Sequence, residues 1–252
     1  MKTYLSDPNT FVKDNLSNWR GNTNFWLEAH LQHISDVRSL VAQLLQRVTA
    51  TARHGFRVID MGCGNAWILD MLGALNLDMR YLGLDFNDLL INELTRTRSS
   101  QTASFRLLDV QESIPADLIE AADLVINAFN FFELPGLQGA FGNAARMLDR
   151  GGALLLITVD PITQLISMAD THDDLRTALR LYANHGASLC YDKHVETAEG
   201  LDERLYKGIL YKLSDYHRLA REYDMTLEML EERLCIHDLR PQLYQVALWR
   251  GK

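Results

Sequence analysis

Two glycines and a distant aspartate are the residues whose types and spacing most clearly predict ligand binding. Gly62 and Gly64 lie between a strand-like run and a helix-like run, and Asp85 lies 23 residues beyond Gly62. Glycine lets the backbone turn sharply and approach a ligand, which the N-terminus of the following helix also faces. A carboxylate about 20 residues further on can accept hydrogen bonds from ribose hydroxyls. The pattern therefore predicts a cofactor that contains a nucleoside.

The residue at position 67 disfavours a nicotinamide cofactor. The dinucleotide pattern needs a third glycine there for close packing of helix and strand, and this sequence has the bulky Trp67. The run of residues 58–66, Val-Ile-Asp-Met-Gly-Cys-Gly-Asn-Ala, instead resembles the first motif of the class I S-adenosylmethionine-dependent methyltransferases. Ala66 stands where that family most often has a third glycine.

The resemblance continues in register over residues 56–159 and again at the C-terminus. It implies that Asp85 holds the ribose hydroxyls and that Phe86 packs on the adenine. It also implies that Asp109 accepts a hydrogen bond from the adenine amino group, that Val110 donates its backbone N–H, and that Asn127 lies near the methionine moiety. The full set of cofactor-binding residues that it implies is Asp60, Gly62, Cys63, Gly64, Asp85, Phe86, Asp109, Val110 and Asn127.

The elements that must position these residues alternate between strands and helices. Strands are predicted at residues 56–61, 79–84, 104–108, 122–129 and 153–159, and helices at residues 66–75, 87–98 and 137–148. Such alternation is typical of a parallel sheet covered by helices on both faces. With two more strands at residues 225–232 and 243–249, we expect an α/β, Rossmann-like, seven-stranded and mostly parallel sheet. The resemblance implies that the last strand is antiparallel and lies beside the fifth.

The chain, residues 1–252, is predicted to form a single methyltransferase domain, because no repeat or linker divides it. Residues 1–54 would form an N-terminal lid and a helix, residues 55–159 the cofactor-binding core, and residues 205–252 the C-terminal part of the sheet. Residues 160–204 are too many for a structureless loop, so we expect a helical lid over the substrate there.

The acceptor side of the site is less constrained by the sequence. The sulfonium methyl is already activated, so catalysis needs in-line placement of the acceptor atom and exclusion of water. A hydroxyl acceptor would gain from a general base, whereas a carboxylate or a neutral amine needs little more than placement. His194 and His185, with Tyr191 between them, are the candidate catalytic bases, and surface or packed histidines are the alternative.

Other side chains near the predicted fourth strand could contact an acceptor. Phe129, Phe131 and Phe132 could line an apolar pocket or belong to the core, and Glu133 could bind a cation or cap a helix. Residues 127–132 contain no proline, unlike the Asn-Pro-Pro-Tyr motif of nucleic-acid and glutamine N-methyltransferases. Methylation of exocyclic amines on bases is therefore disfavoured.

Three further features have competing interpretations. Trp19 and Arg20 could fold over the methionine carboxylate or lie on an exposed arm. His30 and His33 share a helical spacing, but cysteine and carboxylate partners at ligand spacing are absent, so no metal is expected. Cys63 at a helix N-terminus could be a nucleophile, although the family often has cysteine there without a catalytic role.

Composition narrows the class of function. The formal net charge is −8, with 25 Lys and Arg against 33 Asp and Glu, and no basic run suggests binding to nucleic acid. The N-terminus does not resemble a signal peptide, no apolar run could span a bilayer, and the three separated cysteines suit a reducing cytoplasm. We expect a cytoplasmic enzyme that methylates an O or N atom of a small metabolite, with S-adenosylhomocysteine as coproduct. The alternatives are an enzyme that modifies RNA or protein, and a non-catalytic scaffold subunit; oligomeric state is open.

Overall fold

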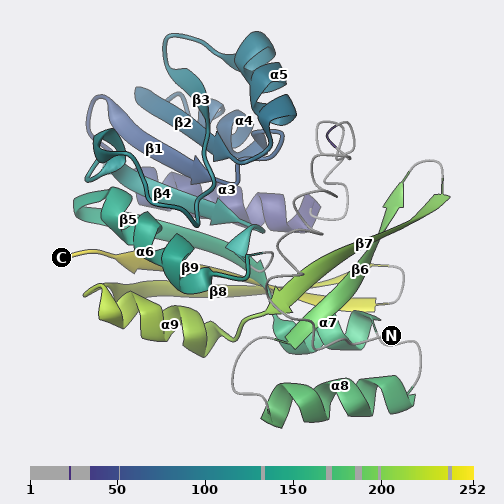
Figure 1. Cartoon of the computed structure of the whole chain (residues 1–252). Helices are drawn as coiled ribbons and strands as arrows, with labels where there is room; N and C mark the ends of the chain where they lie inside the picture. Colours follow the sequence, from purple (N-terminus) through teal and green to yellow (C-terminus); the bar gives the residue numbers. More distant parts are fainter. Residues whose placement is uncertain are drawn as a thin grey trace.

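A seven-stranded sheet forms the centre of the computed structural model, which describes residue 23 and residues 35–50, 52–131, 134–168, 172–184, 189–197, 200–237 and 240–252 (Figure 1). Its strands are β1 (Phe56–Met61), β2 (Met79–Asp85), β3 (Ala103–Leu107), β4 (Ala122–Ala128), β5 (Leu148–Val159), β8 (Thr226–His237) and β9 (Arg240–Arg250). They lie in the order β3-β2-β1-β4-β5-β9-β8. Strands β1 to β5 pair in parallel, and β9 is antiparallel to β5 and β8. The predicted sheet and its antiparallel last strand are confirmed.

Helices cover both faces of this sheet. The helices α3 (Ser35–Thr49), α4 (Trp67–Gly73) and α5 (Asp88–Arg98) pack on one face, and α6 (Leu137–Met147) and α9 (Leu213–Glu222) pack on the other. In β1, Val58 belongs to the core under α3 and α4, whereas Ile59 belongs to the core under α6. Both faces of the central strands are therefore buried, which explains their continuous apolar runs.

The largest departure from the predicted fold lies between β5 and α9. The first part of this insertion is helical as predicted, with α7 (Pro161–Met168) and α8 (His172–Asn184). The prediction is wrong for the second part, because β6 (Leu189–Thr197) and β7 (Gly200–Leu210) form a separate two-stranded antiparallel sheet that extends beyond the main sheet (Figure 1). A register shift between Lys193 and Val195 interrupts the alternation of β6, which removes the sequence signal of a strand.

Several element boundaries also differ from those predicted. β5 begins at Leu148 rather than at residue 153, because Leu148 pairs with Ala122 before a register shift in the β4–β5 ladder. The long predicted helix at residues 24–48 is described only from Ser35 onward. Within the described ranges, no helix is both long and apolar enough to cross a membrane.

Candidate functional site

The loop between β1 and α4 has the backbone conformation that its glycines predict. Gly62 and Gly64 have φ angles of +71° and +52°. A Cβ on Gly62 would lie 2.5 Å from Cγ of Asn130, so a larger residue would clash there, whereas the space next to Gly64 is open. The N–H groups of Gly62 and Cys63 donate to the carbonyl of Leu84 at 2.8 and 2.9 Å, which fixes the loop against the end of β2.

Asp85 at the end of β2 faces this loop. One carboxylate oxygen, Oδ2, accepts a hydrogen bond from the Gly64 N–H at 3.2 Å, and Oδ1 accepts one from the Asn87 N–H at 3.0 Å. The residue is buried, with 8% of its surface exposed. Burial raises the pKa of Asp85 to about 6, and the hydrogen bonds to its carboxylate oppose that rise. The carboxylate is therefore charged at neutral pH and held at the junction of two loops.

Asp60, in β1, is a second buried carboxylate close to the loop. Its Oδ2 accepts a hydrogen bond from the Tyr81 hydroxyl at 2.7 Å. Its Oδ1 is buried and has no hydrogen-bond partner among the described residues. Burial raises the pKa of Asp60 to about 7, and repulsion by Asp85 adds to the rise. Such an unpaired oxygen is costly in a folded protein, which is characteristic of a site that awaits a ligand or a water molecule.

The loop after β3 is fixed by contacts with α6. Oδ1 of Asp109 accepts hydrogen bonds from the backbone N–H of Gln111 at 2.9 Å and from its side-chain amide at 3.3 Å. The carbonyl of Val110, a buried residue, accepts a hydrogen bond from Nδ2 of Asn143 at 2.8 Å. Asp109 and Val110 follow the carboxyl end of β3, which pairs with β2. The resemblance places the adenine at this end of the sheet.

The end of β4 is held by the side chain of Asn127. This fully buried amide donates to the carbonyl of Met61 at 3.1 Å, and its Oδ1 accepts a hydrogen bond from the N–H of Phe131 at 3.0 Å. The same Nδ2 lies 3.2 Å from Oδ1 of Asn130. The Asn127 side chain therefore joins the ends of β1 and β4, and its Nδ2 group already donates to two acceptors within the protein.

Of the predicted phenylalanines, Phe129 lies beside the glycine loop. Its ring stacks on Trp67 at the start of α4, with centroids 6.5 Å apart, and meets the edge of Tyr244 at 5.9 Å. Its φ of +60° is rare for an aromatic residue and marks local strain at this strand end. Phe131 instead is fully buried and stacks on Tyr216, which agrees with the core interpretation.

Cys63 is a buried thiol rather than a reactive one. It is 2% exposed, and burial together with the nearby Asp85 and Asp60 carboxylates raises the pKa of its thiol well above the usual value. A protonated thiol is a poor nucleophile, so the helix N-terminus does not activate it. Among the described residues, no group of three or more His, Cys, Asp or Glu side chains could hold a metal ion.

Several candidate residues fall outside the described part of the chain: Trp19, Arg20, His30, His33, Phe132, Glu133 and His185. His194 lies on β6 beside the register shift, and Tyr191 on the same strand pairs with Gly208. Thr23, from the predicted N-terminal lid, is buried, and its hydroxyl accepts a hydrogen bond from Nδ2 of Asn87 at 3.1 Å. This contact places one residue of the N-terminal segment next to the loop that carries Asp85.

Arg98 is a residue of this region that the sequence did not single out. Its guanidinium donates to the carbonyls of Asn65 at 2.6 Å and Ala66 at 3.4 Å, and it also bonds to the Asp70 carboxylate. Arginine is common in the last turn of a helix because it stabilises the helix dipole. The position of Arg98 in the sequence therefore does not indicate that it also bonds to the glycine loop.

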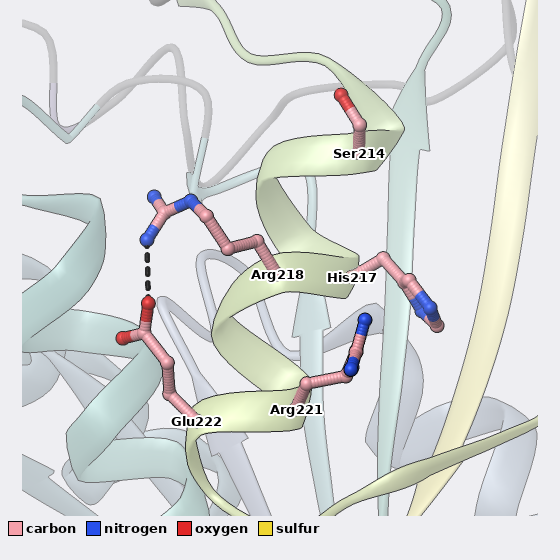
Figure 2. Close-up of a pocket in the computed structure, with 5 residues that line it drawn as sticks. All are labelled: Ser214, His217, Arg218, Arg221 and Glu222. Atoms are coloured by element: carbon pink, nitrogen blue, oxygen red, sulfur yellow. Dashed lines mark hydrogen bonds and ion pairs between the residues drawn. The ribbon is translucent and has the colours of Figure 1, made fainter.

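A hollow on the outer surface of α9 is separate from these loops. It has a volume of about 490 Å³ and is lined by Ser214, His217, Arg218, Arg221 and Glu222. Figure 2 shows Arg218 turned toward Glu222, to which it bonds at 2.7 Å, with His217 and Arg221 on the other flank of the helix. None of the predicted site residues lines this hollow, so it is not part of the candidate site.

A family model and two curated relatives each match part of this sequence. Residues 58–152 match a family model described as a methyltransferase domain. The juvenile hormone acid O-methyltransferase of Bombyx mori is 30% identical over 105 residues, which cover 40% of this chain and 38% of that protein. A non-reducing polyketide synthase of Gibberella zeae is 27% identical over 127 residues, which cover 46% of this chain and 6% of the synthase. The alignments thus span less than half of either curated relative.

A solved structure also resembles the whole chain. The 1,6-didemethyltoxoflavin-N1-methyltransferase of Burkholderia thailandensis, crystallised with 1,6-didemethyltoxoflavin and S-adenosylhomocysteine, has a TM-score of 0.65 at 11% identity. The similarity covers 100% of this chain and 93% of that chain. At so low an identity the likeness shows the fold alone.

Proposed function

This chain carries a methyltransferase domain on a Rossmann-like fold, and from that premise we propose that it transfers a methyl group from S-adenosylmethionine to a small molecule. The observation that carries the proposal is the Asp85 carboxylate, which is buried at the end of β2 and accepts a hydrogen bond from the Gly64 N–H. A ribose has two adjacent hydroxyls that can donate to such a carboxylate.

The residues present fit the proposed cofactor. Asp85 and Phe86 would bind the ribose and the adenine, Asp109 and the Val110 N–H would bind the adenine edge, and the glycine loop would lie along the methionine moiety. The open space next to Gly64 and the unpaired Oδ1 of Asp60 agree with a polar ligand at this loop. The cofactor would supply an electrophilic methyl group that needs no further activation.

The work of the protein is then to place the acceptor and exclude water. The acceptor atom must lie about 3–3.5 Å from the methyl group and in line with the bond that breaks. Phe129, held between Trp67 and Tyr244, lies at the strand end where an apolar part of an acceptor would pack. Residues of the N-terminal segment and the insertion would cover the site, and the Thr23–Asn87 contact supports this for the N-terminal segment. His194 and His185 remain candidate bases for a hydroxyl acceptor.

Two observations favour a small acceptor over a macromolecule. The names of two relatives specify small acceptors, juvenile hormone acid for the silkworm enzyme and 1,6-didemethyltoxoflavin for the Burkholderia enzyme. The net charge of −8 also disfavours binding to RNA, because such binding depends on clustered Lys and Arg. The acceptor atom would be oxygen or nitrogen, as in these two enzymes.

Methyl transfer from labelled cofactor tests the proposal. The protein would be incubated with S-adenosylmethionine labelled in the methyl group and with separate pools of carboxylic acids, phenols, small amines, total RNA and unfolded protein. We expect label in at least one small-molecule pool, together with formation of S-adenosylhomocysteine. Label only in RNA or protein would support the modifying alternative instead. If no pool gains label and no S-adenosylhomocysteine forms, the proposal is wrong. The result would then support the non-catalytic scaffold instead.

A further inference from the structure

Ala66 adopts a backbone conformation that is unfavourable for alanine. It lies directly before α4, with φ 60° and ψ 37°, in the left-handed region, and it is fully buried. In that region the Cβ of an L-residue crowds the following carbonyl oxygen, whereas glycine has no such penalty. Some other contact must therefore hold this part of the glycine loop in place.

The Arg98 guanidinium makes that contact. It bonds to the carbonyl of Asn65 at 2.6 Å and to that of Ala66 at 3.4 Å. Its side chain is 27% exposed, so these bonds are partly shielded from water. Hydrogen bonds from a charged donor are stronger than neutral ones, and a bond in a shielded place is stronger still.

The Asn65 carbonyl belongs to the peptide plane that determines φ of Ala66. The opposite side of the same plane is also held, because the Ala66 N–H donates to the carbonyl of Cys63 at 2.8 Å. Because its carbonyl and its N–H are both bonded, the Asn65–Ala66 peptide cannot rotate. A negative φ at Ala66 would require the loss of both hydrogen bonds. Arg98 and the Cys63 carbonyl thus jointly impose the left-handed conformation.

We propose that Arg98 is a positioning residue for the cofactor loop, since its bonds to the Asn65 and Ala66 carbonyls hold Ala66 in a left-handed conformation. This inference rests on the proposed binding of S-adenosylmethionine. The clamped peptide lies one residue after Gly64, whose N–H binds the Asp85 carboxylate. Loss of the clamp would let residues 64–66 relax, and the carboxylate that receives the ribose would lose its orientation.

A suppressor variant distinguishes this role from a general effect on folding. Arg98→Met removes the guanidinium and keeps much of the apolar stem, while Ala66→Gly removes the need for the clamp. Arg96→Met is the matched control, because the exposed Arg96 lies on the same helix and pairs only with Glu93 among the bonds described. Dissociation constants for S-adenosylhomocysteine would be measured by calorimetry for each variant and for Arg98→Met combined with Ala66→Gly.

We expect Arg98→Met to weaken binding about tenfold, which is the size expected from a left-handed alanine. In the Ala66→Gly background the same substitution should weaken binding less than about twofold, and Arg96→Met should leave it unchanged. Unchanged binding in Arg98→Met, or an equal loss in both backgrounds, would overturn the inference.

Thermal unfolding of the wild-type protein, the two single variants Arg98→Met and Ala66→Gly and their double variant gives a readout that needs no cofactor. The decrease in Tm caused by Arg98→Met should be smaller in the Ala66→Gly background than in the wild-type background. An equal decrease in both backgrounds would show that Arg98 does not hold Ala66 in its conformation. If the wild-type protein binds no S-adenosylhomocysteine, the proposed function fails by itself, and this unfolding cycle still decides whether Arg98 and Ala66 are coupled.

Discussion

The carboxylate of Asp85 accepts a hydrogen bond from the backbone N–H of Gly64 at 3.2 Å, so the end of β2 is joined directly to the glycine loop after β1. The second oxygen of the same carboxylate accepts from the Asn87 N–H, at the start of α5. One buried charge thus fixes two loops that follow neighbouring parallel strands, at the sheet edge where such folds bind their ligands.

This arrangement predicts that cofactor binding depends on pH. The pKa of Asp85 is raised to about 6, and ribose hydroxyls donate better to the ionised carboxylate than to the neutral acid. Affinity for S-adenosylhomocysteine should therefore increase as the pH rises through about 6 and reach a plateau above about 7. Calorimetric titrations across this range would measure it. In Asp85→Asn the affinity should be weaker and should lack the increase through about pH 6, and a wild-type affinity that falls over that range would contradict the assignment.

The raised pKa of Asp60 predicts that the free energy of unfolding of the ligand-free protein depends on pH. Its pKa is raised from 3.8 to about 7, so between these values the folded state holds a proton that the unfolded state has lost. Stability should accordingly decrease as the pH rises, on the order of 2 kcal/mol between about pH 5 and about pH 7. Asp85 contributes in the same direction up to about pH 6.

The change can be measured by urea unfolding at several pH values. Asp60→Asn removes the buried charge and can keep an acceptor for the Tyr81 hydroxyl, so its stability should decrease less as the pH rises. The carboxylates of Asp123 and Asp149 have lowered pKa values and lose their stabilising charge only in stronger acid, so they do not interfere. Stability that increases with pH over this range would refute the assignment of a raised pKa to Asp60.

A charged cluster at the other end of β1 should contribute to stability but not to binding. The Arg57 guanidinium bonds to both oxygens of Asp123 at 3.1 Å and to Asp149 at 2.6 Å. We expect Arg57→Met to lower the free energy of unfolding by roughly 1–2 kcal/mol, because it leaves the partly buried Asp123 carboxylate without its cation.

The matched control for that cluster is Arg106→Met. Arg106 bonds to the largely exposed Asp117, so its loss should cost less than about 1 kcal/mol. Denaturant titration measures both variants, and neither should change the affinity for S-adenosylhomocysteine. Equal stability losses in the two variants would show that burial does not strengthen the Arg57 cluster.

The sequence predicts the strands that are buried on both faces of the sheet, because burial requires a run of apolar residues. Strands β1, β4 and β5 are buried on both faces and appear as continuous apolar runs, and Asp85 was found by its spacing from Gly62. Arg98 could not be found in this way, because its partners are backbone carbonyls 32 and 33 residues away, and any residue type can supply them. The sheet of β6 and β7 was missed because a register shift breaks the alternation of β6.

We propose that the loop after β1 and the Asp85 carboxylate together bind S-adenosylmethionine. Calorimetric titration of the wild-type protein and of Asp85→Ala with S-adenosylmethionine, S-adenosylhomocysteine and NADH tests it most directly. We predict saturable binding of the first two ligands by the wild-type protein, no binding of NADH, and at least a tenfold loss of affinity in Asp85→Ala, or about 1.4 kcal/mol. Absence of binding by the wild-type protein, or undiminished binding by a folded Asp85→Ala variant, would show that Asp85 and this loop do not form the cofactor site.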